Sequence, residues 1–193
     1  MYVWGGSYGT HWAHRMLQQR PDGIDGFIFD GFLTPNQFAF LNYDRGAEEA
    51  GEAFAAACDG DASCTARLGP GGALAKVHAV LDGLEASPCA GFDKRQARTL
   101  LTQFLDSFFG RALVFPTVHR LERCSADDVV ALQFVAQTYG ALLEQAYDVP
   151  YVNSGVLQLN IVLSELWATP GEVTPSKQEL DTAADAQAFL AGQ

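Results

Sequence analysis

The chain has 193 residues, of which 48% are hydrophobic and 18% charged, a balance typical of a folded globular domain rather than of a disordered chain. Its 12 basic and 23 acidic residues give a net charge of −11, which argues against nucleic acids and anionic membrane surfaces as partners, because both attract an excess of Lys and Arg. No apolar run approaches the ~20 residues that span a bilayer, and no signal peptide opens the sequence.

The first thirty or so residues predict a strand, a helix and a second strand. The segment MYVW is short and apolar and predicts a buried strand that ends at Gly5 and Gly6. Residues 10–19 place apolar side chains at helical spacing, and the turn residues PDG stop this helix. Residues 25–30 predict a second buried strand. This order is typical of a parallel βαβ unit, which takes about 30 residues.

Beyond Thr34 and Pro35 the sequence carries almost no strand signals and instead predicts helices. They are predicted over residues 47–57, 74–84, 94–109, 125–147 and 153–167. Ser125 is followed by Asp127 and Asp128, a pattern that caps a helix N-terminus and matches its dipole. The acidic, Ala-rich residues 176–193 predict a surface helix.

These elements predict an α/β fold in three parts. Residues 1–34 form a partial α/β core of one βαβ unit, residues 35–170 form a large helical domain, and residues 171–193 form a tail that starts the return to the core. A parallel strand pair needs neighbouring strands and helices on both faces. We therefore expect the chain to be a piece of a larger protein.

The residues that predict chemistry are Gly5-Gly6-Ser7-Tyr8-Gly9, which match the pattern G-x-S-x-G. In this pattern a sharp turn from strand to helix exposes the serine as a nucleophile, and small residues two before and two after it avoid collisions. The N–H of Tyr8 is then an oxyanion donor. The alternative is a structural or phosphate-binding glycine turn, although a phosphate loop would carry a Lys that is missing here.

A catalytic base and acid are harder to assign. The histidines are His11, His14, His78 and His119. The first two follow Ser7 on its own helix, where geometry keeps them from serving as its base, and the last two fit structural roles. Asp30 ends the second strand, where some hydrolases place the acid, but a turn-capping role is favoured. We assign neither group, because on such folds both follow the nucleophile late in the chain.

The segments GGSYGT, RPDGIDGFIFDGFLTP and LNYDRGAEEAGEAFAAAC-x5-C, together with VHRLERCSADDVVAL and NIVLSELW, resemble the S33 serine peptidases. More narrowly, they resemble the tripeptidyl-aminopeptidase-like branch of the α/β-hydrolases, over about residues 1–167. The resemblance implies that Ser7 is the nucleophile, that Tyr8 supplies an oxyanion N–H, and that the helical domain is a lid over the active site. It also implies that the triad acid and His follow the lid, so that this chain alone is inactive.

Cys58 and Cys64 lie in CDGDASC, and no C-x-x-C pair predicts a zinc site. The resemblance favours a disulfide between them and an extracellular or periplasmic location, while the alternative is two free thiols in a cytosolic protein. The pairing of Cys89 and Cys124 stays open.

Glu165, in SELW, is a candidate partner for a substrate ammonium group, against the alternatives of a helix-surface Glu or one paired with an Arg. Three aromatic residues are expected in the core, namely Trp167, Phe108 and Phe109.

We expect a serine aminopeptidase that acts on peptide N-termini through an acyl-enzyme on Ser7, without a cofactor or metal. The alternatives are an esterase or lipase-like hydrolase, and a non-catalytic remnant that binds a partner. The negative net charge would attract cationic substrates such as peptides with a free amino terminus, although acidic residues also simply solvate helix surfaces.

Overall fold

The computed structural model describes residues 1–34, 38–147 and 154–189. The chain divides into two compact units. Unit 1 comprises Met1–Asn42 and Ser154–Thr174, and unit 2 comprises Tyr43–Asn153 and Pro175–Gln193. Unit 1 thus combines the first residues of the chain with a segment from near its end, and unit 2 comprises the residues between them and the last residues.

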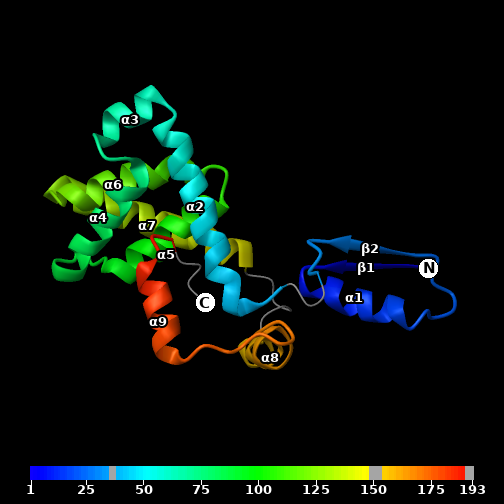
Figure 1. The fold of residues 1–193 in the computed structure, drawn as a ribbon. Coiled ribbons are helices and arrows are strands. Elements are labelled where there is room, and N and C mark those ends of the chain that lie inside the picture. The colour runs from blue at the N-terminus through cyan, green and yellow to red at the C-terminus, as the bar shows by residue number, and fades with distance from the viewer. Residues whose placement is uncertain (35–37, 148–153, 190–193) are drawn as a thin grey trace. The chain divides into compact units, whose positions relative to one another are not determined.

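The predicted α/β fold class is wrong. The structure is 67% helical, and within the described ranges its sheet has two strands (Figure 1). A partial α/β-hydrolase core would need more parallel strands beside this pair, and the segments that follow residue 34 carry helical rather than strand patterns. The expectation of a large helical region fits in part, since helices make up most of the chain.

Unit 1 begins with the predicted strand–helix–strand. Strand β1 (Tyr2–Gly6) pairs in parallel with β2 (Gly26–Asp30), with Tyr2 opposite Gly26 and Gly6 opposite Asp30. Helix α1 (Tyr8–Gln18) connects them and buries Thr10 and Ala13. The short apolar runs explain the strands, and Gly5 and Gly6 explain why β1 gives way to a turn.

The rest of unit 1 comes from two distant parts of the sequence. Besides the short helix η1 (Phe40–Asn42), unit 1 contains α8 (Gly155–Ile161) and η3 (Val162–Leu166), a wider π-helical turn, which come much later in the chain. The Leu41 N–H donates to the Trp167 carbonyl at 3.0 Å, and the Asn42 amide donates to Glu172 at 3.1 Å. The predicted helix at 153–167 is therefore present from Gly155 onward.

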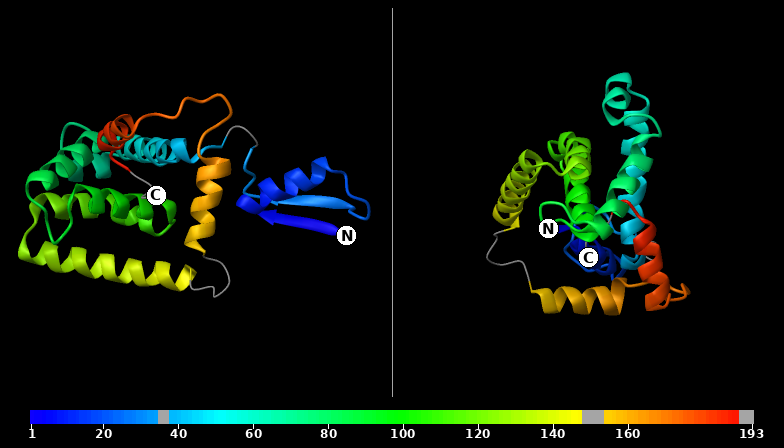
Figure 2. Two further views of the ribbon diagram at one scale, coloured as in Figure 1. Left: turned by 90° about the horizontal axis from the view of Figure 1, so that it is seen from below. Right: turned by 90° about the vertical axis from the view of Figure 1, so that its left-hand side faces the viewer.

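Unit 2 is a helical assembly (Figures 1 and 2). Its helices are α2 (Tyr43–Asp59), α3 (Ala62–Leu68), α4 (Ala73–Ala86), α5 (Lys94–Asp106), η2 (Gly110–Leu113), α6 (Val114–Arg123), α7 (Ala126–Tyr147) and α9 (Lys177–Ala186). Helices α2, α4, α5, α7 and α9 correspond to predicted ones. Helices α3 and α6 were not predicted. Helix α3 is very short, and Pro116 argued against a helix over α6, although it stands in the first turn, where a helix tolerates proline.

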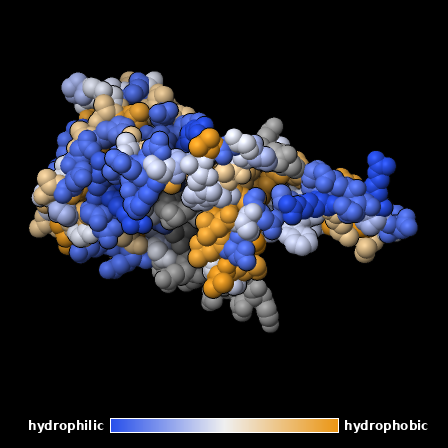
Figure 3. Space-filling model, turned by 60° about the horizontal axis from the view of Figure 1, so that its bottom comes forward, coloured by the Kyte–Doolittle hydropathy of each residue, from blue (hydrophilic) through white to orange (hydrophobic). Residues whose placement is uncertain are grey.

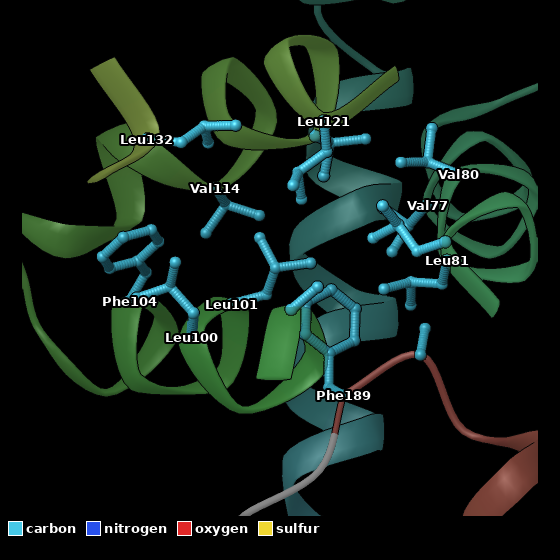
Figure 4. Packing of buried hydrophobic residues seen from close by; sticks show 14 of the residues in the cluster. Val77, Val80, Leu81, Leu100, Leu101, Phe104, Val114, Leu121, Leu132 and Phe189 are labelled. Atoms are coloured by element: carbon cyan, nitrogen blue, oxygen red, sulfur yellow. The ribbon is translucent and has the colours of Figure 1, made fainter. Parts of the chain in front are cut away.

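The core of unit 2 is made of aliphatic and aromatic side chains (Figure 4). Its largest fully buried members are Phe104, Phe189, Leu81, Leu101 and Leu132. Each such side chain contributes about 1.5–3 kcal/mol by leaving water. Helix α4 contacts α2, α5 and α6, so the core continues from one helix to the next.

Phe189 enters this core after the end of α9. A Cβ on Gly51 of α2 would lie 2.0 Å from the Phe189 ring, so the ring occupies the space that glycine leaves. The backbone N–H groups of Ala188 and Phe189 donate to Glu48 at 2.9 and 2.8 Å. Residues 140 positions apart are thereby joined in one packed site.

Two disulfides link the helices of unit 2. Cys58–Cys64 connects the end of α2 to α3, with 5.3 Å between Cα atoms, and confirms the expected pair. Cys89–Cys124 connects the loop before α5 to the end of α6, with 5.8 Å between Cα atoms, and answers the open pairing. Both bonds are compatible with an oxidising compartment. Within residues 1–34, 38–147 and 154–189, no helix has the length and hydrophobicity to cross a membrane.

The expectation that Phe108 and Phe109 lie in the core is wrong. Their side chains are 80% and 83% exposed, and their rings meet edge to face at 5.4 Å. They stand in the turn between α5 and η2, where the chain has left the buried face of α5. Figure 3 shows one face of the molecule, on which several hydrophobic areas are exposed. Trp167 is half-buried.

Candidate functional site

Ser7 occupies the turn between β1 and α1 in a strained backbone conformation. Its φ is 49° and its ψ is −122°, which lies outside the regions that residues with a side chain usually adopt. The residue is exposed. Strain of this kind costs about 1–3 kcal/mol and is concentrated at active sites and ligand clamps. A strained serine between a strand and a helix is the geometry that the G-x-S-x-G pattern predicts.

Hydrogen bonds on both sides hold Ser7 in this conformation. Its N–H donates to the Asp30 carbonyl at 2.8 Å. Its carbonyl accepts from the Thr10 N–H at 2.9 Å and from Thr10 Oγ1 at 2.7 Å. Thr10 is fully buried, and its hydroxyl also accepts from the Leu33 N–H at 2.9 Å. Thr10 thus connects the turn to the segment that follows β2.

The two glycines of the motif differ in what they permit. A Cβ on Gly5 would lie 2.4 Å from the Gly9 carbonyl oxygen, so only glycine lets the end of β1 approach the start of α1 this closely. A Cβ on Gly9 would meet nothing within 4 Å in the described part of the chain. The expectation that both positions must be small therefore has a steric basis at Gly5 and none at Gly9.

Tyr8 begins α1. At this position its N–H has no carbonyl four residues earlier within the helix to bond, which leaves it available to an anion. Its side chain lies in a separate network: the Tyr8 hydroxyl accepts from Trp12 Nε1 at 3.1 Å and donates to Glu165 Oε2 at 3.2 Å. Burial raises the pKa of the Tyr8 phenol, so it stays a donor at neutral pH.

Glu165 lies in the π-helical turn η3 and faces α1. Besides Tyr8, its Oε2 lies 3.3 Å from Arg15 Nη1 and 3.8 Å from His11 Nε2. The Glu165 side chain is 29% exposed. An Arg partner is one of the alternatives that the sequence left open. The pairing with Arg15 was not predictable, because the two residues are 150 positions apart. Wider π-helical turns occur frequently at functional sites.

Beside this carboxylate is a cavity of about 250 Å³ within unit 1. It is lined in part by His11, Arg15, Phe38, Ser164 and Glu165. Burial, and then the charge of Arg15, lower the pKa of the His11 imidazole, which is therefore neutral at pH 7. Its Nε2 is buried and has no hydrogen-bond partner in the described residues. The cavity combines one carboxylate, one guanidinium and one neutral imidazole.

No hydrogen bond joins Ser7 Oγ to a histidine or a carboxylate among the described residues. Asp30 takes part in the turn through its backbone carbonyl, as the Ser7 contact shows. His14 meets Phe32 edge to face at 6.0 Å, which fits a packing role. His78 and His119 belong to unit 2. Thr10 was not predicted as a site residue, although its place directly after GGSYG was a usable signal.

Comparisons of this chain with family models, with curated proteins and with solved structures found no match. Its function must therefore be inferred from the geometry around Ser7. In the part of the chain that the structure describes, no cluster of His, Cys, Asp and Glu could hold a metal ion.

Proposed function

We propose that this protein is a serine hydrolase whose nucleophile is Ser7. The observation that carries the proposal is the strained, exposed Ser7 at the junction of β1 and α1. A structural turn would be more stable with glycine at a positive φ, so a serine there is best explained by a need for its hydroxyl. The hydrogen bonds of its backbone to Asp30 and Thr10 fix the Ser7 backbone, and with it the direction of the Cα–Cβ bond, in advance of any substrate.

In the proposed reaction Ser7 Oγ attacks the carbonyl carbon of the substrate and loses its proton to an imidazole base. The carbonyl oxygen becomes an oxyanion that accepts from the Tyr8 N–H. The bond to the leaving amine or alcohol then breaks, the leaving group takes the proton from the base, and the acyl group remains on Ser7 until water releases it. The resemblance to S33 peptidases implies that the base and its acid follow the helical region, after residue 170.

A peptide amino terminus is the substrate that the surroundings of Ser7 favour. Glu165 contacts Tyr8, the residue next to the nucleophile, and lines the cavity beside α1. A substrate ammonium at this carboxylate would form a charge-assisted hydrogen bond and share Glu165 with Arg15. The two disulfides are in line with an extracellular or periplasmic enzyme.

The nucleophile is tested by labelling the protein, expressed from its complete reading frame, with a fluorophosphonate, which attaches to activated serines, and by mapping the modified peptide. We expect one adduct on Ser7 and its complete loss in Ser7→Ala. Ser63→Ala, which removes an exposed serine of α3, should label like the wild type. An unchanged adduct in Ser7→Ala, or no adduct on any serine, would sink the proposal and favour a non-catalytic binding role.

The substrate class is tested with a peptide ester carrying either a free or an acetylated amino terminus. We expect Glu165→Gln to raise KM for the free peptide by about tenfold, the loss of one charge-assisted contact, and to leave the acetylated peptide unaffected. Glu49→Gln, on the exposed side of α2, is the matched control. Equal KM changes for both peptides would exclude ammonium binding, and turnover of simple esters alone would favour the esterase alternative.

A further inference from the structure

A larger cavity, of about 830 Å³, lies entirely within unit 2 among α2, α3, η2 and α6. Its walls are mainly apolar. The rings of Phe54 and Phe115 stack at 5.2 Å and line it, together with buried Leu68 and the Cys58–Cys64 disulfide. Sites for small organic ligands typically measure about 300–1,000 Å³ and combine such walls with a few polar groups.

The polar groups of this cavity are mostly basic. Arg67, Arg111 and His119 line it, and all three are exposed, so they contribute the solvent-facing part of the lining. Among the described lining residues one is acidic, Asp61, and its Oδ1 already accepts from the Cys64 N–H at 2.8 Å as the cap of α3. The mouth is therefore positive in a chain whose net charge is −11.

Two of these basic groups lack a carboxylate partner. Within the described ranges, neither Arg67 nor Arg111 forms an ion pair. Arg111 donates through Nε to the Leu105 carbonyl at 2.9 Å, so its two terminal nitrogens remain available to a ligand. Elsewhere in unit 2, Arg120 and Arg123 share one buried carboxylate. Arg20 and Arg95 also form no ion pair among the described residues, so the feature that distinguishes Arg67 and Arg111 is that both line one apolar cavity, where an anionic ligand would supply the missing negative charge.

We propose that this cavity binds a small amphiphilic anion, with an apolar chain among Phe54, Phe115 and Leu68 and a carboxylate held at the mouth by Arg67 and Arg111. A fatty acid of medium length has this chemistry. The inference does not depend on the role of Ser7, because every residue involved lies in unit 2.

The experiment is calorimetric titration of the full chain with dodecanoate and with dodecanol, which shares the apolar chain but lacks the charge, both below their aggregation concentrations. We expect saturable 1:1 binding of dodecanoate. Arg67→Gln and Arg111→Gln should each weaken dodecanoate by about tenfold, the usual effect of losing one charged hydrogen bond, and leave dodecanol unchanged. Arg95→Gln, at an exposed Arg of α5 outside the cavity, should bind both ligands like the wild type.

A second pair of variants tests the apolar part. Ala57 is exposed and lines the cavity, whereas Ala53 lies one turn earlier on α2 and does not. Ala57→Trp should abolish binding of both ligands and Ala53→Trp should not, with circular dichroism showing that both fold. The proposal would be overturned if dodecanoate showed no saturable binding, or if the Arg95 and Arg67 variants lost the same amount of dodecanoate affinity. The proposal would also be overturned if the chain self-associated and Ala57→Trp abolished this self-association, because a second copy of the chain would then occupy the cavity.

Discussion

At Ser7 the chain holds a conformation that a residue with a side chain rarely keeps, at a cost of about 1–3 kcal/mol. Three hydrogen bonds to its backbone, one from Ser7 to Asp30 and two from Thr10 to Ser7, each stabilise the fold by about 0.5–1.5 kcal/mol. The combined stabilisation by the three hydrogen bonds is similar in size to the cost of the strained backbone. The turn is therefore maintained by its immediate neighbours, and Thr10 is the residue on which it depends most.

The steric role of Gly5 gives a prediction at the same scale. Gly5→Ala forces a Cβ against the Gly9 carbonyl and should lower the free energy of unfolding by about 1–3 kcal/mol, the usual cost of overpacking. Gly9→Ala is the control, because its Cβ meets open space within α1, and it should stay within about 1 kcal/mol of the wild type. Urea unfolding followed by circular dichroism measures both, and a larger loss for Gly9→Ala would contradict the packing described here.

The residues of the G-x-S-x-G motif were predictable from the sequence, but the residues that they contact in the fold were not. The glycines and Ser7 were recognisable because the pattern is local and falls between a strand and a helix, although the structure gives a steric reason only at Gly5 and not at Gly9. The contact of Glu165 with Tyr8 and Arg15 joins segments 150 or more positions apart, and no local pattern encodes such a distance. Phe108 and Phe109 were misplaced because hydrophobicity alone does not report that a helix has just ended before them.

A network of side-chain hydrogen bonds stabilises the N-terminus of α7. Asp128 is fully buried and accepts from Arg120 at 2.9 Å and from the Ser125 hydroxyl at 2.7 Å, while Ser125 Oγ in turn accepts from the Asp128 N–H at 3.3 Å. Arg123 adds two further donors. This reciprocal pair resembles a capping box with Asp in place of Glu. The hydrogen bond from Arg123, followed by that from Ser125, holds the pKa of Asp128 far below its ordinary value of 3.8.

The lowered pKa fixes the sign of a pH effect. A carboxyl whose pKa is depressed on folding stabilises the protein above its unfolded pKa, and this stabilisation is lost as pH falls through the folded pKa. The thermal midpoint should therefore drop more steeply from about pH 4 downward in the wild type than in Asp128→Asn, which starts several degrees lower at pH 7. Asp127→Asn, exposed in the same turn, should follow the wild type. If the thermal midpoints of the wild type and of Asp128→Asn changed with pH in parallel, the ionisation of Asp128 would not be coupled to folding.

Element by element, periodicity succeeded where a segment was long and uninterrupted. Helices α4 and α5 followed from apolar spacing, α2 from its Ala- and Glu-rich composition and α7 from the Ser125 cap signal. The pair β1 and β2 followed from short apolar runs ended by turn residues. The fold class failed because one correct βαβ unit was extended to a whole architecture, whereas the class depends on the strands beside it.

For the whole molecule the two disulfides make unequal contributions. Cys89–Cys124 spans 35 positions and Cys58–Cys64 spans 6, so loop-closure entropy predicts that removing them costs about 4 and about 2 kcal/mol respectively. The comparison uses paired Cys→Ser variants of each bond in urea unfolding. If the shorter loop proved the more important, the disulfides would be acting on native packing around α3 rather than on the unfolded chain.

The place of Phe189 in the core has a consequence for how the protein is made. Glu48 and Gly51 leave the ribosome long before the residues that they hold, which lie about 140 positions later. At about 5–20 residues per second, translation separates the two by roughly 7–28 s. Until Phe189 is synthesised, the space beside Gly51 that its ring fills stays empty, and the core cluster to which Leu81 and Leu101 belong is incomplete. The packed core of this unit therefore cannot be completed before Phe189 has been synthesised.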